Sequence, residues 1–246
     1  MIRVRIIRAR GSTPREEGAE MMVGPNTVTG TIGGGQLEYL AIDRARMMLA
    51  KDETQARMDV PLGPDIGQCC GGRVELALDR AAATVPVPGP AILIFGAGHV
   101  GRALARALLP LPFAPRLIDQ RAAELSLAAP GVPTTLTPLP EAELRAAPPG
   151  ASVVIVTHDH ALDFLLGIEA LARPDAPYIG MVGSRTKRAT FDRFARSHGA
   201  DPARLVCPIA AGFPRDKRPE VIAAFTAAEI AARLLTHAPA PALHAP

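Results

Sequence analysis

The chain has 246 residues, of which 48% are hydrophobic and 21% charged, so it can bury a sizeable core and is not disordered as a whole. No apolar run reaches the roughly 18 residues of a membrane-spanning helix, and the N-terminus lacks the pattern of a signal peptide. A net charge of +3, the absence of tryptophan and only two tyrosines argue against a large basic or base-stacking surface, so we expect neither nucleic acid nor a membrane as a partner.

Two proline-rich stretches divide the chain. Residues 83–90 predict a linker and residues 237–246 a flexible tail. They leave an N-terminal α+β domain over residues 1–82 and a larger domain over residues 91–236. In the first domain, apolar patterning predicts strands, and a Gly-rich segment leads into an amphipathic helix that ends near residue 49. The predicted strands are 2–7, 20–23, 26–32, 56–60 and 73–79.

In the second domain, short apolar runs alternate with helical patterns. The runs predict strands at 91–95, 116–119, 152–157, 178–183 and 205–209. Helices are predicted for 100–109, 162–172, 187–198 and 219–235. In the last helix, one apolar face is predicted from Val221, Ile222, Phe225 and Ile230. The alternation predicts a doubly wound parallel sheet, so the fold class is α/β, with a Rossmann-like C-terminal domain and a smaller N-terminal α+β domain.

A Gly-rich loop joins the first strand and helix of the second domain. Gly96, Gly98 and Gly101, with His99 among them, form a GxGxxG pattern, and Asp119 ends the next predicted strand. Glycines permit a tight turn, the helix N-terminus attracts phosphate, and Asp119 could accept hydrogen bonds from a ribose. The pattern predicts a nucleotide-type fold. Two uses of that fold stay open, namely binding of a nicotinamide dinucleotide and a scaffold for another phosphorylated ligand.

The N-terminal domain carries two further loops of chemical interest. Three glycines precede its helix, namely Gly33, Gly34 and Gly35. Their backbone N–H groups could form an anion-binding cradle, and a tight turn that needs positive φ angles explains them equally well. The second loop contains Gln68, Cys69 and Cys70. An accessible Cys69 thiolate could bind a soft metal or carry sulfur, with packing beside a turn as the alternative. Three cysteines form no disulfide framework, so we expect a cytoplasmic protein.

Two polar groups follow predicted strands at the edge where open α/β sheets place ligands. His158 and His160 follow the third strand and could contact a polar substrate or ligate a metal, although helix capping with solvent exposure also explains them. Ser184, Arg185 and Lys187 open the helix after the next strand. Cations at the positive end of a helix are unfavourable unless an anion binds, so this segment predicts a phosphate or carboxylate contact, with a solvated basic face as the alternative.

These motifs occur in a fixed order along the chain. They are RARGSTPREEGAEMMV, GTIGGGQLE, GQCCGG, IFGAGHVGRAL, VTHDHALD and YIGMVGSRTKR, between residues 8 and 198. In this combination the chain resembles the XdhC/CoxI family, the xanthine dehydrogenase accessory proteins. It departs from the family pattern before its first strand, where the leading segment is short. It departs again in residues 207–218, which lack the Gly-rich loop of many members.

The resemblance implies a chaperone for the molybdenum cofactor, a phosphorylated pterin whose dithiolene holds molybdenum, and not an enzyme. Such a chaperone protects the cofactor, presents it to a cysteine desulfurase for sulfuration and delivers it to the molybdenum-binding subunit of xanthine dehydrogenase. The Gly-rich and basic loops would bind the phosphate, and Cys69 would approach the metal, in a cleft between the two domains. NAD is not expected, but an NAD(P)-dependent oxidoreductase that uses the GAGHVG loop and Asp119 stays the alternative. The sequence also leaves a homodimer open.

Overall fold

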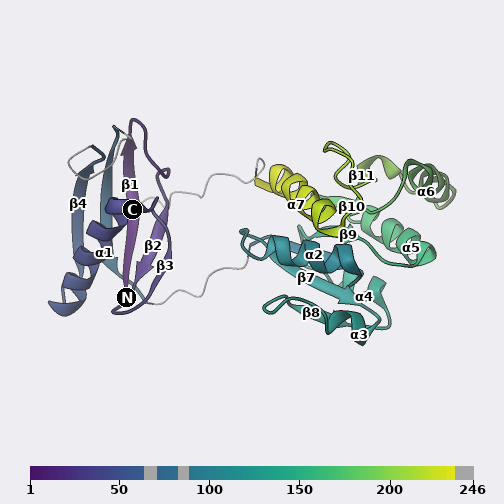
Figure 1. Ribbon diagram of the computed structural model, residues 1–246, viewed down its shortest axis with the longest axis horizontal. Helices are drawn as coiled ribbons and strands as arrows, with labels where there is room; N and C mark the ends of the chain where they lie inside the picture. The colour runs from purple at the N-terminus through teal and green to yellow at the C-terminus, as the bar shows by residue number, and fades with distance from the viewer. Residues whose placement is uncertain (64–70, 83–88, 236–246) are drawn as a thin grey trace. The chain divides into compact units, whose positions relative to one another are not determined.

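The computed structural model describes residues 1–63, 71–82 and 89–235, which form two compact units (Figure 1). The predicted tail and most of the predicted linker lie outside these residues, so the domain boundaries at residues 82 and 91 stay a prediction. Within the described residues, no helix is long and apolar enough to cross a membrane.

The described part of the N-terminal unit is a five-stranded antiparallel sheet with a helix on one face. Its elements are β1 (Ile2–Arg10), β2 (Glu20–Val23), β3 (Val28–Gly30), α1 (Gly35–Ala50), β4 (Gln55–Pro61) and β5 (Arg73–Arg80). The strands follow the order β3-β2-β1-β5-β4, so the first strand lies in the centre of the sheet.

Alternation along β1 explains which face of this sheet is buried. Ile2, Val4 and Ile6 are fully buried on one face. Helix α1 shares their core through Leu37 and Met48, and alanines between these two residues let the helix approach the sheet closely. Each fully buried Leu, Ile or Met side chain contributes about 1.5–3 kcal/mol. The predicted α+β layer is confirmed.

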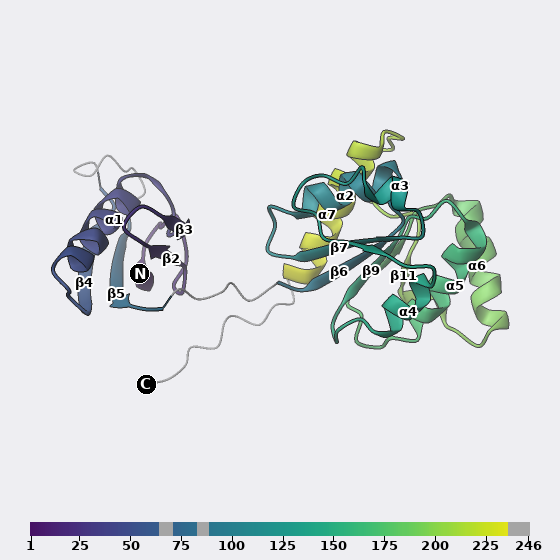
Figure 2. The same ribbon diagram turned by 90° about the horizontal axis from the view of Figure 1, so that it is seen from below.

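The second unit is a six-stranded parallel sheet flanked by helices (Figure 2). Its strands are β6 (Ala91–Phe95), β7 (Ala114–Asp119), β8 (Thr134–Leu136), β9 (Ser152–Ile155), β10 (Ile179–Met181) and β11 (Leu205–Val206). Its α-helices are α2 (His99–Leu108), α3 (Ala122–Leu125), α4 (Pro140–Arg145), α5 (His160–Leu171), α6 (Arg185–Ser197) and α7 (Pro219–Leu235). The strand order β11-β10-β9-β6-β7-β8 confirms the predicted doubly wound, Rossmann-like sheet.

Helices cover both faces of the parallel sheet. Ile92 and Ile94 of β6 share one core with α2 and α7. Leu93 and Phe95 of the same strand share the other core with α4, α5 and α6. Because β6 is buried on both faces, its sequence is a continuous apolar run without alternation.

The buried face of α7 differs from the predicted one. The fully or nearly fully buried residues are Ala223, Thr226, Ala227 and Ile230. Small side chains let α7 lie close to α2, so three of these four positions are alanine or threonine. Of the predicted apolar face, Ile230 is fully buried and Ile222 packs against the same core while partly exposed. Val221 and Phe225 are only partly buried, and Ile222 and Phe225 also line a surface hollow.

Three short elements have no counterpart in the sequence patterns. They are α3 with four residues, β8 with three and α4 with six. Segments of this length are shorter than two helical turns or one typical strand, so they show no usable periodicity. Their place in the fold follows from pairing of β8 with β7, a tertiary contact.

Candidate functional site

The carboxyl ends of the parallel strands bring several of the predicted residues together. Strands β6 and β9 are neighbours, and the chain leaves them toward opposite faces of the sheet, into α2 and α5. Such a switch point leaves a crevice outside the ends of the two strands, where open α/β sheets bind ligands. The loop after β6 contains Gly96 and Gly98, and the loop after β9 contains Thr157 and His158.

The glycines of the GxGxxG pattern have two different structural roles. Gly96 has a φ of +112°, and a Cβ there would lie 2.4 Å from the carbonyl oxygen of Val156. A Cβ at Gly101 would lie 1.8 Å from the carbonyl oxygen of Gly96. These two positions therefore need glycine so that the backbone segments can pack. A Cβ at Gly98 would meet nothing within 4 Å, so the backbone at the start of α2 faces open space.

Asp119 is held by groups of the protein itself. It is 6% exposed, and its Oδ2 accepts a hydrogen bond of 2.6 Å from the backbone N–H of Ala97. Arg121 donates from its backbone N–H, Nε and Nη2, each at 2.9 Å. Burial by itself would raise the pKa of Asp119, but the bonds from Arg121 and Ala97 outweigh it and hold the pKa below its ordinary value. A ribose hydroxyl would have to displace one of these donors.

A hollow of about 500 Å³ opens at the switch point, and we call it the switch-point hollow. Its lining residues are Gly98, His99, Val100, Arg121, Glu124, Val156, Thr157, His158, Val182 and Pro219. Small-molecule sites have volumes of about 300–1,000 Å³, so this hollow can hold an organic ligand. His99 and His158 are both exposed there, so their imidazoles are available to such a ligand. The fold thus gathers Gly98, His99 and His158 from two separate loops.

A buried ion pair supports the loops around the hollow. Asp163 of α5 is fully buried and pairs with Lys187 of α6, whose side chain is 9% exposed. Asp163 also accepts hydrogen bonds from the backbone N–H of Thr157 at 3.2 Å and from its hydroxyl at 2.6 Å. Lys187 Nζ donates to the carbonyl oxygen of Val182 at 2.9 Å. Lys187 therefore joins the ends of β9 and β10, and it is not a lining residue of the switch-point hollow.

The rest of the basic segment is partly structural and partly exposed. Ser184 caps α6, because its hydroxyl accepts a hydrogen bond of 3.1 Å from the backbone N–H of Lys187. Arg188 pairs with Asp192 at 2.6 Å and donates to carbonyl oxygens near β11. Arg185 is exposed and, with Ser184, lines a second hollow beside α7.

Helix capping explains part of the THDH segment. Asp159 is the N-cap of α5, and its Oδ1 accepts hydrogen bonds of 2.8 and 3.4 Å from two backbone N–H groups of the first turn. His160 is the first residue of that helix, is exposed, and does not line the switch-point hollow. In this segment, Thr157 and His158 face the hollow and Asp159 begins the helix.

The three glycines before α1 form a tight turn. Gly33, Gly34 and Gly35 have φ angles of +122°, +75° and +65°. A Cβ at Gly33 would also lie 2.5 Å from Pro14. Side chains other than glycine rarely adopt such angles, so the turn requires these residues whether or not an anion binds.

The same turn surrounds a carboxylate that belongs to the chain. Glu38 Oε1 accepts hydrogen bonds from Thr31 Oγ1 at 2.5 Å and from the backbone N–H groups of Ile32 and Gly34 at 2.9 Å each. Burial by itself would raise the pKa of Glu38, but these bonds outweigh it and lower the pKa. Part of the expected N–H cradle therefore holds Glu38.

The loop ends near the cysteine motif lie beside other motif residues of the N-terminal unit. A Cβ at Gly72 would lie 2.2 Å from the carbonyl oxygen of Ser12, so residues 71–72 and 11–12 are in contact. Gln68, Cys69 and Cys70 of this motif lie outside the described part of the chain, and their roles stay predictions. Within the described residues, no three His, Cys, Asp or Glu side chains gather as a metal site.

Several polar residues that support the site were not among the predicted site residues. Arg102 pairs with Glu124 and donates to the carbonyl oxygen of Ala97 at 2.6 Å, so it supports the Gly-rich loop. Arg121 lies two residues after Asp119, which ends β7. This short spacing could have identified Arg121 as a partner of Asp119. Asp163 ends the VTHDHALD motif, but no local pattern indicates its partner Lys187, which lies 24 residues away.

Comparisons with known proteins agree with this fold. The family model of the XdhC Rossmann domain matches residues 92–230, and the model of the XdhC and CoxI family matches residues 1–60. The uncharacterized protein YqeB of Escherichia coli (strain K12) is 28% identical over 238 residues, which cover 92% of this chain and 42% of YqeB. The chain thus spans less than half the length of this curated relative.

A solved structure shares the fold across the chain. The crystal structure of a xanthine dehydrogenase (BH1974) from Bacillus halodurans matches with a TM-score of 0.81 at 18% identity, covering 98% of this chain and 94% of that one. The XdhC Rossmann-domain model covers more than half of the residues of this chain, so the chain belongs to the XdhC/CoxI family.

Proposed function

We propose that this protein binds the molybdenum cofactor as cargo, in the switch-point hollow of its Rossmann-like unit. The observation that carries the proposal is the hollow itself. It lies at the carboxyl ends of β6 and β9 and has a volume of about 500 Å³. The imidazoles of His99 and His158 line it. Family membership supplies the class of cargo, and the hollow supplies a place of suitable size and polarity.

The groups around the hollow suit the organic part of this cargo. A terminal phosphate would lie at the start of α2, where the accessible backbone of Gly98 and the positive helix end favour an anion. The pterin ring carries donors and acceptors that the two imidazoles can match. Among the described residues no metal-binding cluster competes for the molybdenum. For the metal we keep the proposed contact to Cys69, which lies outside the described residues.

The steps that follow binding are proposed from the family. The protein would shield the cofactor from oxidation and present it to a cysteine desulfurase, which supplies the sulfur. It would then deliver the sulfurated cofactor to the molybdenum-binding subunit of xanthine dehydrogenase. In this scheme the chain binds and transfers cargo and performs no catalytic step of its own.

Oxygen-free gel filtration tests this proposal. The protein is mixed with freshly released cofactor, and pterin fluorescence and molybdenum are measured in the protein peak. We expect both at near stoichiometric amounts in the wild type, and much less in a His99→Gln/His158→Gln variant. His198→Gln is the matched control, because His198 is exposed at the far end of α6 and bonds to Phe194. Pterin that elutes only with small molecules, or is retained equally by all three proteins, would contradict the proposal.

An NAD(P)-dependent oxidoreductase is the second candidate, because the strand order and the Gly-rich loop match dinucleotide-binding domains. The hydrogen bonds of Asp119 argue against an oxidoreductase, because Arg121 and Ala97 already donate to both of its carboxylate oxygens. Titration with NAD(H) separates the two. Micromolar binding that is lost in Asp119→Asn would favour the oxidoreductase, and absence of binding would remove it.

A further inference from the structure

A second hollow lies beside α7, and only Val182 lines both this one and the switch-point hollow. It has a volume of about 550 Å³. Its walls are the end of β10, the start of α6, the loop over residues 208–217 and the first turns of α7. We call it the α7 hollow. Its volume also falls within the range of about 300–1,000 Å³ for small-molecule sites.

Aromatic and aliphatic side chains form one side of the α7 hollow. Ile222 and Phe225 of α7 line the hollow, and Ile222 also packs against the core under this helix. Phe213 from the loop stacks on Phe225, with ring centroids 4.7 Å apart and ring planes within 8° of parallel. Phe213 is 36% exposed, so part of its ring is open to a ligand. A planar ring could extend this stack.

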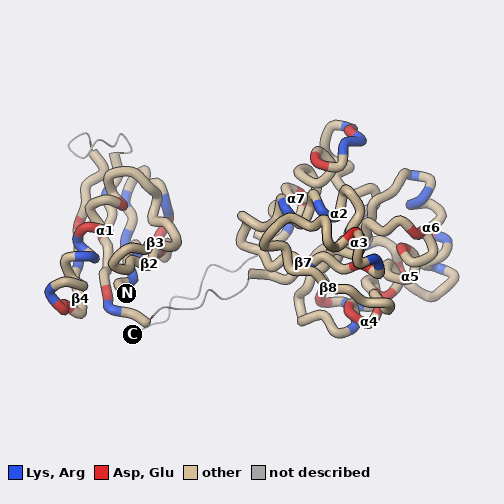
Figure 3. The backbone as a smooth tube through the Cα atoms, turned by 60° about the horizontal axis from the view of Figure 1, so that its bottom comes forward, with Lys and Arg blue, Asp and Glu red and all other residues tan. Residues whose placement is uncertain are grey.

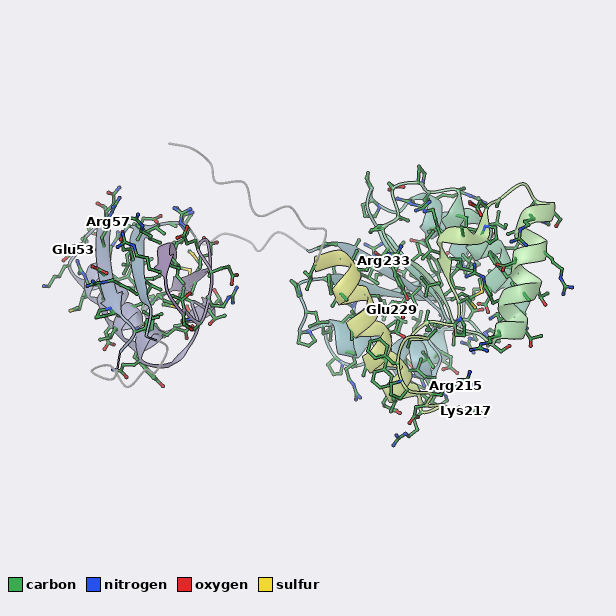
Figure 4. The ribbon with its side chains drawn as sticks, turned by 90° about the horizontal axis from the view of Figure 1, so that it is seen from above. Glu53, Arg57, Arg215, Lys217, Glu229 and Arg233 are labelled. Atoms are coloured by element: carbon green, nitrogen blue, oxygen red, sulfur yellow. The ribbon has the colours of Figure 1, made fainter. Side chains whose placement is uncertain are left out.

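Cations gather at the same hollow. They are Arg185 at the start of α6 and Arg215 and Lys217 in the loop before α7. Figure 4 shows Arg215 and Lys217 close together near one end of α7, and Figure 3 shows the basic segments of this unit in blue. Among the described residues, no carboxylate lies within 4.0 Å of any of the three cations.

The one acid of the lining does not neutralise them. Asp216 pairs with Arg218 at 2.6 Å, and hydrogen bonds from Arg218 lower the pKa of Asp216 to about 2. The two charges cancel each other. The α7 hollow therefore keeps an excess of positive charge, which favours an anionic ligand.

Hydrogen bonds to α7 hold the loop in place. Glu229 accepts one bond of 2.8 Å from the hydroxyl of Tyr178 and another of 2.8 Å from the backbone N–H of Ala210. Ala210 has a φ of +58°, a strained value for a residue with a side chain, and such strain persists where the surroundings fix the backbone. The start of the loop is therefore fixed to α7, and a fixed backbone lowers the entropic cost of binding.

We propose that the α7 hollow is a second binding site, for a fused planar heterocycle that carries an anionic group. The ring stacks on Phe213, and the anionic group lies among Arg185, Arg215 and Lys217. Guanine nucleotides and pterins share this chemistry. The site does not depend on the function proposed above, because none of these four residues lines the switch-point hollow.

Isothermal titration calorimetry of the 246-residue chain tests the proposal, with GMP and 6-carboxypterin as probes. We expect micromolar binding of at least one probe. Phe213→Leu, which keeps an apolar side chain but removes the ring, weakens binding about fivefold. Arg215→Gln weakens it about tenfold. Arg193→Gln is the matched control, since Arg193 is exposed on α6 and lines neither hollow, and it leaves the affinity unchanged.

The probes separate the two sources of ligand. Binding of GMP alone identifies a nucleotide site, and binding of 6-carboxypterin alone identifies a pterin site. No heat from either probe at about 1 mM overturns the proposal. An affinity for inorganic phosphate equal to the affinities for both probes also overturns the proposal, because the ring then contributes nothing to binding. Binding that is lost in His158→Gln and unchanged in Phe213→Leu places the probe in the switch-point hollow and also overturns it. Circular dichroism melts show that each variant is folded.

Discussion

The buried pair of Asp163 and Lys187 gives the sharpest prediction about the site. Replacing Lys187 by methionine keeps most of the length of the unbranched side chain but removes its charge. Asp163, which is fully buried, then keeps only the hydrogen bonds from Thr157. Removing one partner of a buried ion pair costs about 3–5 kcal/mol, because the remaining charge is left uncompensated. The free energy of unfolding of a domain is only about 5–15 kcal/mol, so the effect is large.

Urea unfolding followed by circular dichroism at 222 nm measures this loss. Helices α2 to α7 belong to the Rossmann-like unit, so the signal reports mainly on that unit. With a slope of about 2 kcal/mol per M, a loss of 4 kcal/mol moves the midpoint by about 2 M. The double variant Asp163→Asn/Lys187→Met should lose less than the sum of the two single variants, because the two residues interact directly.

The matched control is Arg145→Met, which breaks the exposed pair of Arg145 and Glu169 between α4 and α5. Exposed pairs are screened by solvent, so the midpoint should hardly move. If Lys187→Met moved the midpoint as little as this control, the buried pair would not support the loops after β9 and β10 as described. Additive effects in the double variant would refute the direct interaction.

Three more predictions follow from the contacts. Gly101→Ala places a Cβ 1.8 Å from the carbonyl oxygen of Gly96 and should lower the free energy of unfolding by about 1–3 kcal/mol or more. Gly98→Ala meets open space and should change the melting temperature little by comparison. The pKa of Glu38 lies below its ordinary value of 4.5, so its stabilising hydrogen bonds are present above this pH and are lost as the pH falls further. The urea midpoint of the N-terminal unit should therefore decline below pH 4.5, and Glu38→Gln should flatten that decline. Tyr178→Phe removes the hydroxyl that donates to a carboxylate on α7 and should cost about 1–2 kcal/mol in urea unfolding.

The sequence predicts the parts of the fold that short-range patterns encode. A continuous apolar run marks β6 because that strand is buried on both faces, and alternation marks β1 because its sheet is buried on one. Gly96 and Gly101 predict a tight strand-to-helix turn. The backbone contacts at these two positions leave no room for a Cβ atom, so the turn requires glycine there. Strand β9 ends at Ile155, two residues before its predicted end, because Thr157 turns to bond with Asp163.

The site could be predicted only in part, because its contacts join distant residues. Lys187 carries a positive charge near a helix N-terminus, which predicts a bound anion, and the structure supplies Asp163 of α5 as that anion. In the N-terminal unit the Gly-rich turn likewise contains the carboxylate of Glu38. No local pattern shows that a carboxylate of the same chain will reach such a place. His99 and His158 were both predicted as site residues, but that they line one hollow depends on the neighbouring strands β6 and β9, and no local pattern gives this strand order.

The residues that form the second hollow show the same limit. Spacing alone places Ile222 and Phe225 on an apolar face of α7, but the structure fully or nearly fully buries smaller residues of that helix and leaves these two partly exposed. The selection comes from the close approach of α2, which leaves room only for small side chains. A helical period identifies amphipathic character, but the partner surface decides which residues it covers.

Hydrogen exchange of the full-length protein, with and without molybdenum cofactor under oxygen-free conditions, tests the central claim most directly. A ligand in the switch-point hollow slows exchange of the amides that it contacts or orders. We predict protection of residues 96–101 and 156–160, the loops after β6 and β9. Unchanged exchange in both loops, with cofactor present in the protein fraction, would place the cargo elsewhere and contradict the proposed site.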